Sequence, residues 1–88
     1  MKSILLVEDE VSISDFIKGE LEYEGYMVCV KEDGRMGLEE ALNNEYDLII
    51  LDVMLPSMNG FEICRRLKRE KNTTVIMLSA KDSVMDKV

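Results

Sequence analysis

Four short apolar runs recur along the 88 residues, and a segment with helical periodicity separates each run from the next. The runs cover residues 4–7, 26–30, 47–51 and 75–78. They are too short for helices, and such runs are typical of strands buried on both faces of a parallel sheet. Strands that alternate with helices predict right-handed crossovers, with helices on both faces of the sheet. The sequence therefore predicts a single α/β domain, which its length also favours.

The segments between the runs carry helix signals. Asp33 is expected to cap the second helix, and Asn59 and Glu62 resemble a capping box at the start of the third. Gly25 suits the position after the end of the first helix. In chain order, the expected inward-facing residues of the three helices are Ile13, Phe16, Ile17 and Leu21, then Leu38, Ala41 and Leu42, then Phe61, Cys64 and Leu67. Near the end of the chain, Ser83 and Asp86 predict the start of a fourth helix.

Acidic residues follow two of the apolar runs. Glu8, Asp9 and Glu10 come after the first run, and Asp52 comes after the third. Ligands of open parallel sheets bind outside the carboxyl ends of the strands, where these carboxylates would crowd if the strands are neighbours. Crowded carboxylates repel one another, and a hard cation such as Mg²⁺ relieves the repulsion. The alternatives are a solvated acidic turn at a helix N-terminus for the triplet and a turn cap for Asp52.

The amino-acid composition of the chain disfavours or excludes several kinds of function. The net charge is −7, which disfavours nonspecific binding to nucleic acid or to an anionic membrane. The chain has no histidine, which excludes the Ser-His-Asp and Cys-His nucleophiles. Cys29 and Cys64 are expected to be reduced core thiols. A basic cluster at residues 65–71 is expected to be a solvated helix face. Without a membrane-spanning stretch or a signal peptide, the chain is expected to be cytoplasmic.

Three stretches together resemble the receiver domain of bacterial two-component response regulators. They are residues 5–10 (LLVEDE), residues 48–56 (LIILDVMLP) with Gly60, and residues 77–82 (MLSAKD). The amino-acid sequence of residues 51–56 and 79–82 most resembles that of the OmpR-like transcription regulators. The resemblance covers the whole chain in order and spacing. It implies a flavodoxin-like fold, a sensor histidine kinase as partner and a transcription regulator as the parent protein.

The resemblance also implies a role for individual residues. Asp52 matches the phosphoacceptor, and Ser79 matches the hydroxyl that moves toward the phosphoryl group. Asp9 matches a direct Mg²⁺ ligand, Glu8 a ligand acting through water, and the carbonyl of Met54 a further ligand. Met54 and Lys81 match variable positions that tune the phosphoryl lifetime. Two rival functions are a receiver-like interaction module that works without phosphorylation and a Mg²⁺-dependent aspartyl phosphatase. A phosphatase would need a second acid two residues after the nucleophile, where Met54 stands.

Measured against this family, residues 1–88 are expected to be a truncated receiver domain without an effector domain. The expected strand order is 2-1-3-4, with the fifth strand and last helix missing. The fifth strand of the family carries a lysine that pairs with the phosphoryl group, and Lys81 is no substitute for it. Residues 75–78 would then be an exposed edge strand, through which the chain is expected to self-associate.

Overall fold

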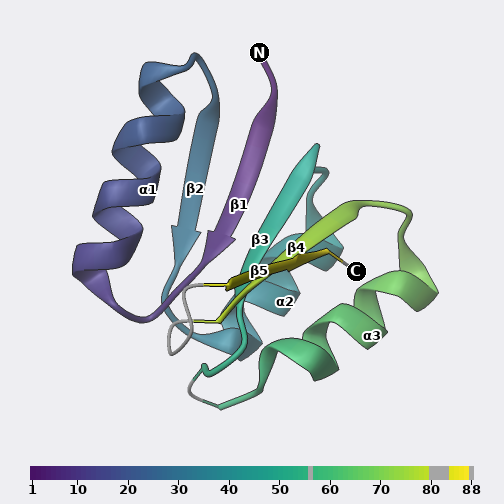
Figure 1. Ribbon diagram of the computed structural model, residues 1–88. Helices are drawn as coiled ribbons and strands as arrows, with labels where there is room; N and C mark the ends of the chain where they lie inside the picture. Colours follow the sequence, from purple (N-terminus) through teal and green to yellow (C-terminus); the bar gives the residue numbers. More distant parts are fainter. Residues whose placement is uncertain (56, 80–83, 88) are drawn as a thin grey trace.

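The computed structural model describes residues 1–55, 57–79 and 84–87, and it shows one sheet with helices on both faces (Figure 1). The elements in chain order are β1 (Ser3–Val7), α1 (Val11–Tyr23), β2 (Met27–Lys31), α2 (Gly34–Asn43), β3 (Leu48–Asp52), α3 (Gly60–Glu70), β4 (Thr74–Ser79) and β5 (Val84–Lys87). The described helices include none that is long and apolar enough to cross a membrane.

The strands lie in the order β2-β1-β3-β4-β5, which confirms the predicted order 2-1-3-4. β1 pairs in parallel with both β2 and β3, and β3 pairs in parallel with β4. Because β1 lies between β2 and β3, Leu6 is a register partner of both Val30 and Ile50. The register also places Val7 beside Leu51, so β1 and β3 end at the same edge of the sheet.

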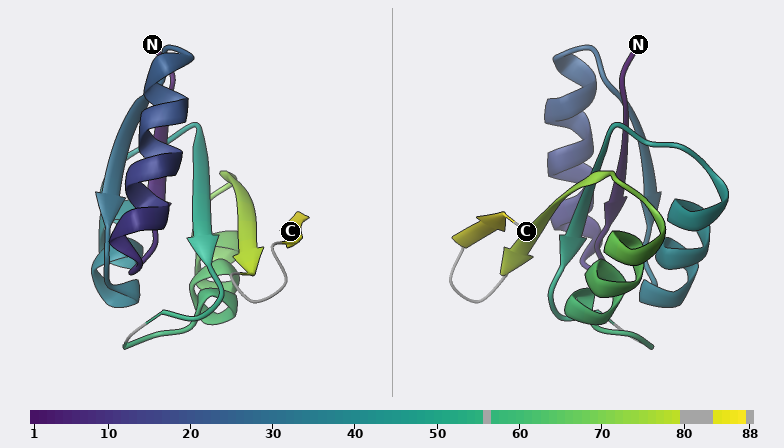
Figure 2. Two further views of the ribbon diagram at one scale, coloured as in Figure 1. Left: turned by 60° about the vertical axis from the view of Figure 1, so that its left-hand side comes forward. Right: turned by 90° about the vertical axis from the view of Figure 1, so that its right-hand side faces the viewer.

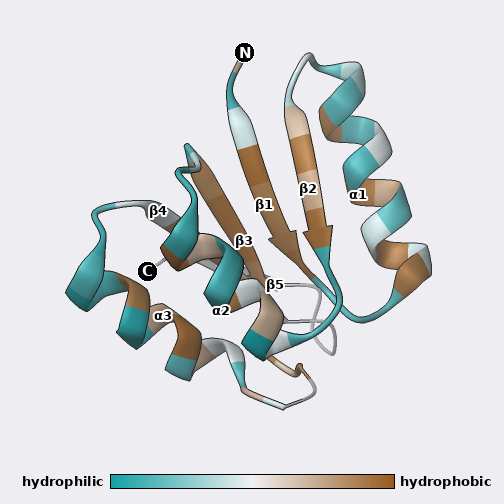
Figure 3. Cartoon of the chain, turned by 180° about the vertical axis from the view of Figure 1, so that it is seen from behind, coloured by the Kyte–Doolittle hydropathy of each residue, from teal (hydrophilic) through white to brown (hydrophobic). Residues whose placement is uncertain are grey.

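Side chains alternate between the two faces of the sheet, so the apolar strands supply two cores. α2 and α3 cover one face and α1 covers the other (Figure 2). The larger core lies beneath α2 and α3, and Figure 3 shows that the strands behind these helices consist mostly of apolar residues, coloured brown. Its buried members are Leu5, Val7, Leu38, Ala41, Ile49, Leu51, Ile63, Cys64, Leu67, Val75 and Met77. The smaller core consists of Ile4, Leu6 and Ile50, with Ile17 and Leu21 of α1 packed against it.

The predicted N-caps Asp33 and Asn59 are confirmed, while no return bond from the Glu62 side chain is found among the described residues. The Asp33 carboxylate accepts a hydrogen bond from the Met36 N–H at 3.1 Å, and Asn59 Oδ1 accepts one from the Glu62 N–H at 2.9 Å. Gly25 follows the end of α1 with φ of +99°, in the region that favours glycine. These signals are local, which explains why the sequence alone located them.

Two predicted inward-facing aromatic residues lie at the surface instead. Phe16 is 69% exposed and Phe61 is 55% exposed. In α3 the buried face consists of Gly60, Ile63, Cys64 and Leu67. Phe61 follows the first of these residues by one position, which turns its side chain about 100° away from the core. The prediction that both aromatic rings belong to the core was wrong.

The predicted fourth helix is also wrong over residues 84–87, while Ser83 lies outside the described residues. These four residues form β5, which pairs antiparallel with β4 and places Asp86 opposite Met77. An unpaired strand edge leaves N–H and C=O groups without partners, and β5 supplies partners along β4. β4 is therefore not the open edge on which the predicted self-association depended.

Candidate functional site

The acidic residues predicted to converge do meet at the carboxyl ends of β1 and β3. One carboxylate oxygen from each of Glu8, Asp9 and Asp52 lies within 4.8 Å of the others. Asp52 is the last residue of β3, and Glu8 and Asp9 follow β1 directly. Glu8 and Asp52 are buried, at 1% and 2% exposure, while Asp9 is exposed. The site thus has two buried acids and one acid open to solvent.

Glu8 is held in place by two backbone contacts. Its N–H donates to the Lys31 carbonyl at 3.0 Å, and its Oε2 accepts from the Glu10 N–H at 3.0 Å. Burial raises the pKa of Glu8 to about 7, although the Glu10 N–H acts in the opposite direction. The charges of Asp52 and Asp9 contribute to the same upward shift of the pKa. Such a shift is the expected result of crowding carboxylates in a buried place without a cation.

Asp52 is oriented by the loop that follows it. The Met54 N–H donates to Asp52 Oδ1 at 3.2 Å. The loop returns at Gly60, whose N–H donates to the Val53 carbonyl at 3.0 Å. A side chain at Gly60 would meet the backbone oxygen of Asp52, so only glycine lets α3 begin this close to the end of β3. The sequence pattern around Gly60 did not indicate this contact.

Two further predicted site residues lie at the same edge of the sheet. Met54 is two residues beyond Asp52, with a side chain that is 60% exposed. Ser79 is the last residue of β4, one position beyond Leu78, which is the register partner of Asp52. The side chain of Ser79 is not among the described parts, and Pro56 and Lys81 lie outside the described residues altogether.

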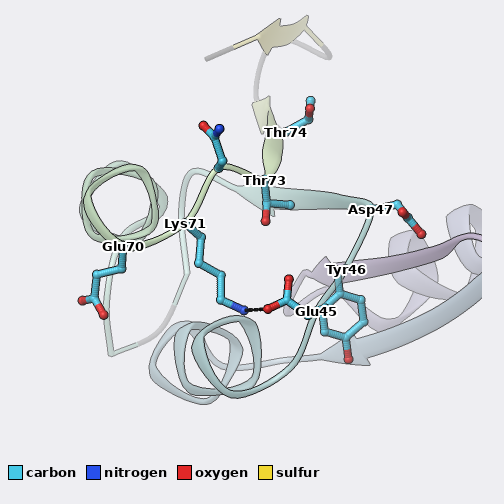
Figure 4. A pocket seen from close by; sticks show the side chains of 8 residues that line it. Glu45, Tyr46, Asp47, Glu70, Lys71, Thr73 and Thr74 are labelled. Atoms are coloured by element: carbon cyan, nitrogen blue, oxygen red, sulfur yellow. Dashed lines mark hydrogen bonds and ion pairs between the residues drawn. The ribbon is translucent and has the colours of Figure 1, made fainter.

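A surface hollow of about 610 Å³ opens beside the acidic residues. It is lined by Asp9, Val53, Met54, Leu55, Asn59 and Phe61. A second hollow, of about 480 Å³, lies at the opposite end of the sheet, before β3 and β4 begin (Figure 4). There Lys71 Nζ pairs with Glu45 Oε2 at 3.1 Å and also donates to the Asn44 carbonyl at 2.8 Å. Because Lys71 is already engaged in that hollow, we place the candidate site at the acidic end.

This fold and site define an α/β protein of the flavodoxin-like class with an acidic centre at its strand ends. The family model described as "Response regulator receiver domain" matches residues 4–88. The chain is 51% identical over 88 residues to the response regulator ArlR of Staphylococcus saprophyticus. It spans about 40% of the length of the curated relatives that it matches.

Solved structures give the same result. The response regulator TrrA of Thermotoga maritima, in complex with Mg²⁺-BeF, matches with a TM-score of 0.86 and 38% identity, over 91% of this chain and 70% of TrrA. The complex of the histidine kinase ThkA with TrrA matches with a TM-score of 0.85 and 37% identity, over 91% of this chain and 70% of the matched chain. The chain belongs to the response regulator receiver domain family.

Proposed function

We propose that the chain accepts a phosphoryl group on the Asp52 carboxylate from a phosphohistidine of a sensor histidine kinase. The observation that carries this proposal is the burial of Asp52 at the end of β3, with oxygens of Glu8 and Asp9 within 4.8 Å. The matched complex of TrrA with the kinase ThkA supports a histidine kinase as the class of partner.

In the proposed reaction, an Asp52 oxygen attacks the phosphorus of the phosphohistidine. The P–N bond breaks, the imidazole nitrogen keeps the bonding electrons, and an acyl phosphate forms on Asp52. The Met54 N–H, bonded to Asp52 Oδ1, helps to fix the direction in which the carboxylate points. We assign to the Ser79 hydroxyl the role of donating to a phosphoryl oxygen, from its place at the end of β4.

The residues of the site also fit Mg²⁺. The donors are all oxygens, as Mg²⁺ prefers, and no ion pair of the described residues involves any of the three acids. We propose that Asp9, Asp52 and the Met54 carbonyl bind the ion directly and that Glu8 acts through a water. When bound, Mg²⁺ would offset the negative charge of the site and of the phosphoryl group. The Mg²⁺-BeF complex of TrrA supports this assignment.

We propose that residues 1–88 are the N-terminal part of a receiver domain in a longer response regulator, since the matched relatives are much longer than this chain. We further propose that the parent protein is a cytoplasmic transcription regulator and that an effector domain lies in its remaining part. In this arrangement, phosphorylation of Asp52 would bias the state of the whole regulator.

Mass spectrometry after treatment with acetyl phosphate and Mg²⁺ tests the site. Any phosphoryl adduct should map to Asp52 and should be absent from the Asp52→Ala variant. The matched control is Asp15→Ala, which removes an exposed carboxylate from α1 and should leave labelling unchanged. Labelling that persists in Asp52→Ala would refute the assignment of the phosphoacceptor.

A further inference from the structure

The loop between β3 and α3, which carries Met54, is tied to the start of α2 by Ser57. The Ser57 hydroxyl oxygen accepts a hydrogen bond from the Arg35 N–H at 3.2 Å. A hydrogen bond from the same hydroxyl to the Asp33 carboxyl is the largest of the causes that hold the pKa of Asp33 below its usual range. Asp33 is the N-cap of α2, and Arg35 lies in its first turn. One serine side chain thus joins the loop to the end of a helix.

The backbone of Ser57 has a conformation that serine rarely adopts. Its φ is +66°, and no other described residue except glycine has a positive φ. A side chain makes this left-handed conformation unfavourable, so glycine and asparagine are the more usual residues there. Such residues persist where the surrounding structure fixes them, and they cluster at functional sites. At this position a glycine could not make the hydrogen bonds with the start of α2.

Further contacts fix the same part of the loop. A Cβ atom on Gly34, the first residue of α2, would meet the carbonyl oxygen of Met58. The side chains of Leu55 and Met58 pack against the larger core. Met54 itself has a side chain that is 60% exposed, so its own packing holds it only weakly. The position of Met54 therefore depends on the anchored residues that follow it.

We propose that Ser57 is a positioning residue of the candidate site, an inference that rests on the proposed function. Ser57 acts through Met54, from which only two residues separate it. By tying the loop to α2, it sets the place of the Met54 carbonyl, the proposed Mg²⁺ ligand, and of the Met54 N–H, which orients Asp52. Groups that orient metal ligands without touching the metal commonly strengthen its binding.

Titration with Mg²⁺ of Ser57→Ala, Ser57→Gly and the wild type tests this role. Both variants lack the hydroxyl, so both should bind Mg²⁺ about three- to tenfold more weakly, which is the effect of losing one hydrogen bond. Ser57→Gly also relieves the unfavourable φ, so urea denaturation should show it to be at least as stable as Ser57→Ala. The affinity for Mg²⁺ should therefore not follow the stability. Thr73→Ala removes a hydroxyl at the opposite end of the sheet and should leave the affinity unchanged.

Amide hydrogen exchange in EDTA measures the positioning of Met54 without the ion. The Met54 N–H should exchange roughly threefold faster or more in both variants than in the wild type, because its loop opens more often. The amides of β1 and β3 should keep their wild-type rates. Addition of Mg²⁺ should slow exchange of the Arg35 N–H in the wild type but not in Ser57→Ala, since coupling between two sites is reciprocal.

Circular dichroism of each variant checks that it is folded. The inference is overturned if the folded Ser57 variants bind Mg²⁺ as tightly as the wild type, if Thr73→Ala weakens binding as much as they do, or if Met54 exchanges at the wild-type rate in EDTA. A wild type that binds no Mg²⁺ would instead refute the proposed ion site. Exchange of the Met54 N–H would then decide alone whether Ser57 positions Met54.

Discussion

A Cβ atom on Gly60 would lie 2.5 Å from the carbonyl oxygen of Asp52. The first residue of α3 thus rests on the last residue of β3, with Met77 Cε also only 3.0 Å from the same Cβ position. The neighbours are mainly backbone and buried side chain, and they have little room to move. This contact ties the start of α3 to the candidate phosphoacceptor.

Gly60→Ala should therefore destabilise the protein. Overpacking of a tight site costs about 1–3 kcal/mol, and urea denaturation should show a loss of that size. The control is Gly19→Ala, since open space surrounds Gly19 on α1. There alanine should increase the free energy of unfolding by up to about 1 kcal/mol, because it favours the helix. Equal effects of the two substitutions would show that the close approach at Asp52 is unimportant.

The raised pKa of Glu8 predicts an unusual pH dependence in the absence of divalent cations. Between pH 4.5 and about 7, the folded protein keeps a proton on Glu8 that the unfolded chain releases. The free energy of unfolding contributed by Glu8 should therefore fall as the pH rises through this window. The full loss would be about 3 kcal/mol, since one pKa unit corresponds to about 1.4 kcal/mol.

Urea denaturation in EDTA at pH 5 and pH 8 measures this effect. In Glu8→Gln most of this loss should disappear. The free energy of unfolding of the variant, relative to that of the wild type, should therefore be higher at pH 8 than at pH 5. Glu39→Gln, which changes an exposed carboxylate on α2, should follow the wild type at both values. If Glu8→Gln and the wild type lose the same stability between the two values, Glu8 is not the group responsible.

A polypeptide of residues 1–88 produced on its own should be a slow phosphoacceptor. The family resemblance assigns a phosphoryl-pairing lysine to a fifth parallel strand, whereas β5 of this chain is antiparallel and places Lys87 beside Ile76, away from the strand end. Loss of one preorganised charge contact costs about 3 kcal/mol, or roughly 100-fold in rate. Labelling by acetyl phosphate, timed beside a complete receiver domain of the family, should show this deficit. Labelling at equal rates would mean that a lysine from a parallel fifth strand is unimportant for the reaction.

Much of the fold was predictable because its signals are local. The apolar runs located β1 to β4, and Asp33 and Asn59 marked the starts of α2 and α3. The wrong predictions share one cause, which is that contacts in the folded chain decided the structure at those positions. Helical spacing alone could not show that Phe16 and Phe61 lie beyond the edge of the buried face. Ser83 and Asp86 predicted the start of a helix, but residues 84–87 pair with the backbone of β4 as a strand.

The acidic centre was predictable for a different reason. The carboxyl ends of neighbouring parallel strands meet at one edge, so Glu8, Asp9 and Asp52 could be placed together once β1 and β3 were expected to be neighbours. The sequence could not show the degree of burial that raises the pKa of Glu8. It also could not show the contact of Gly60 with Asp52, because that contact depends on the path of the whole intervening loop.

Titration with Mg²⁺, followed by calorimetry and by amide NMR shifts, tests the proposed ion site of Asp9 and Asp52. The wild type should bind one ion weakly, with the largest shifts at residues 8–10 and 52–54. Asp52→Asn should remove most of the binding, and Asp15→Asn on α1 should leave it unchanged. If a folded Asp9→Ala, Asp52→Asn double variant binds Mg²⁺ as well as the wild type does, these two residues do not form the ion site.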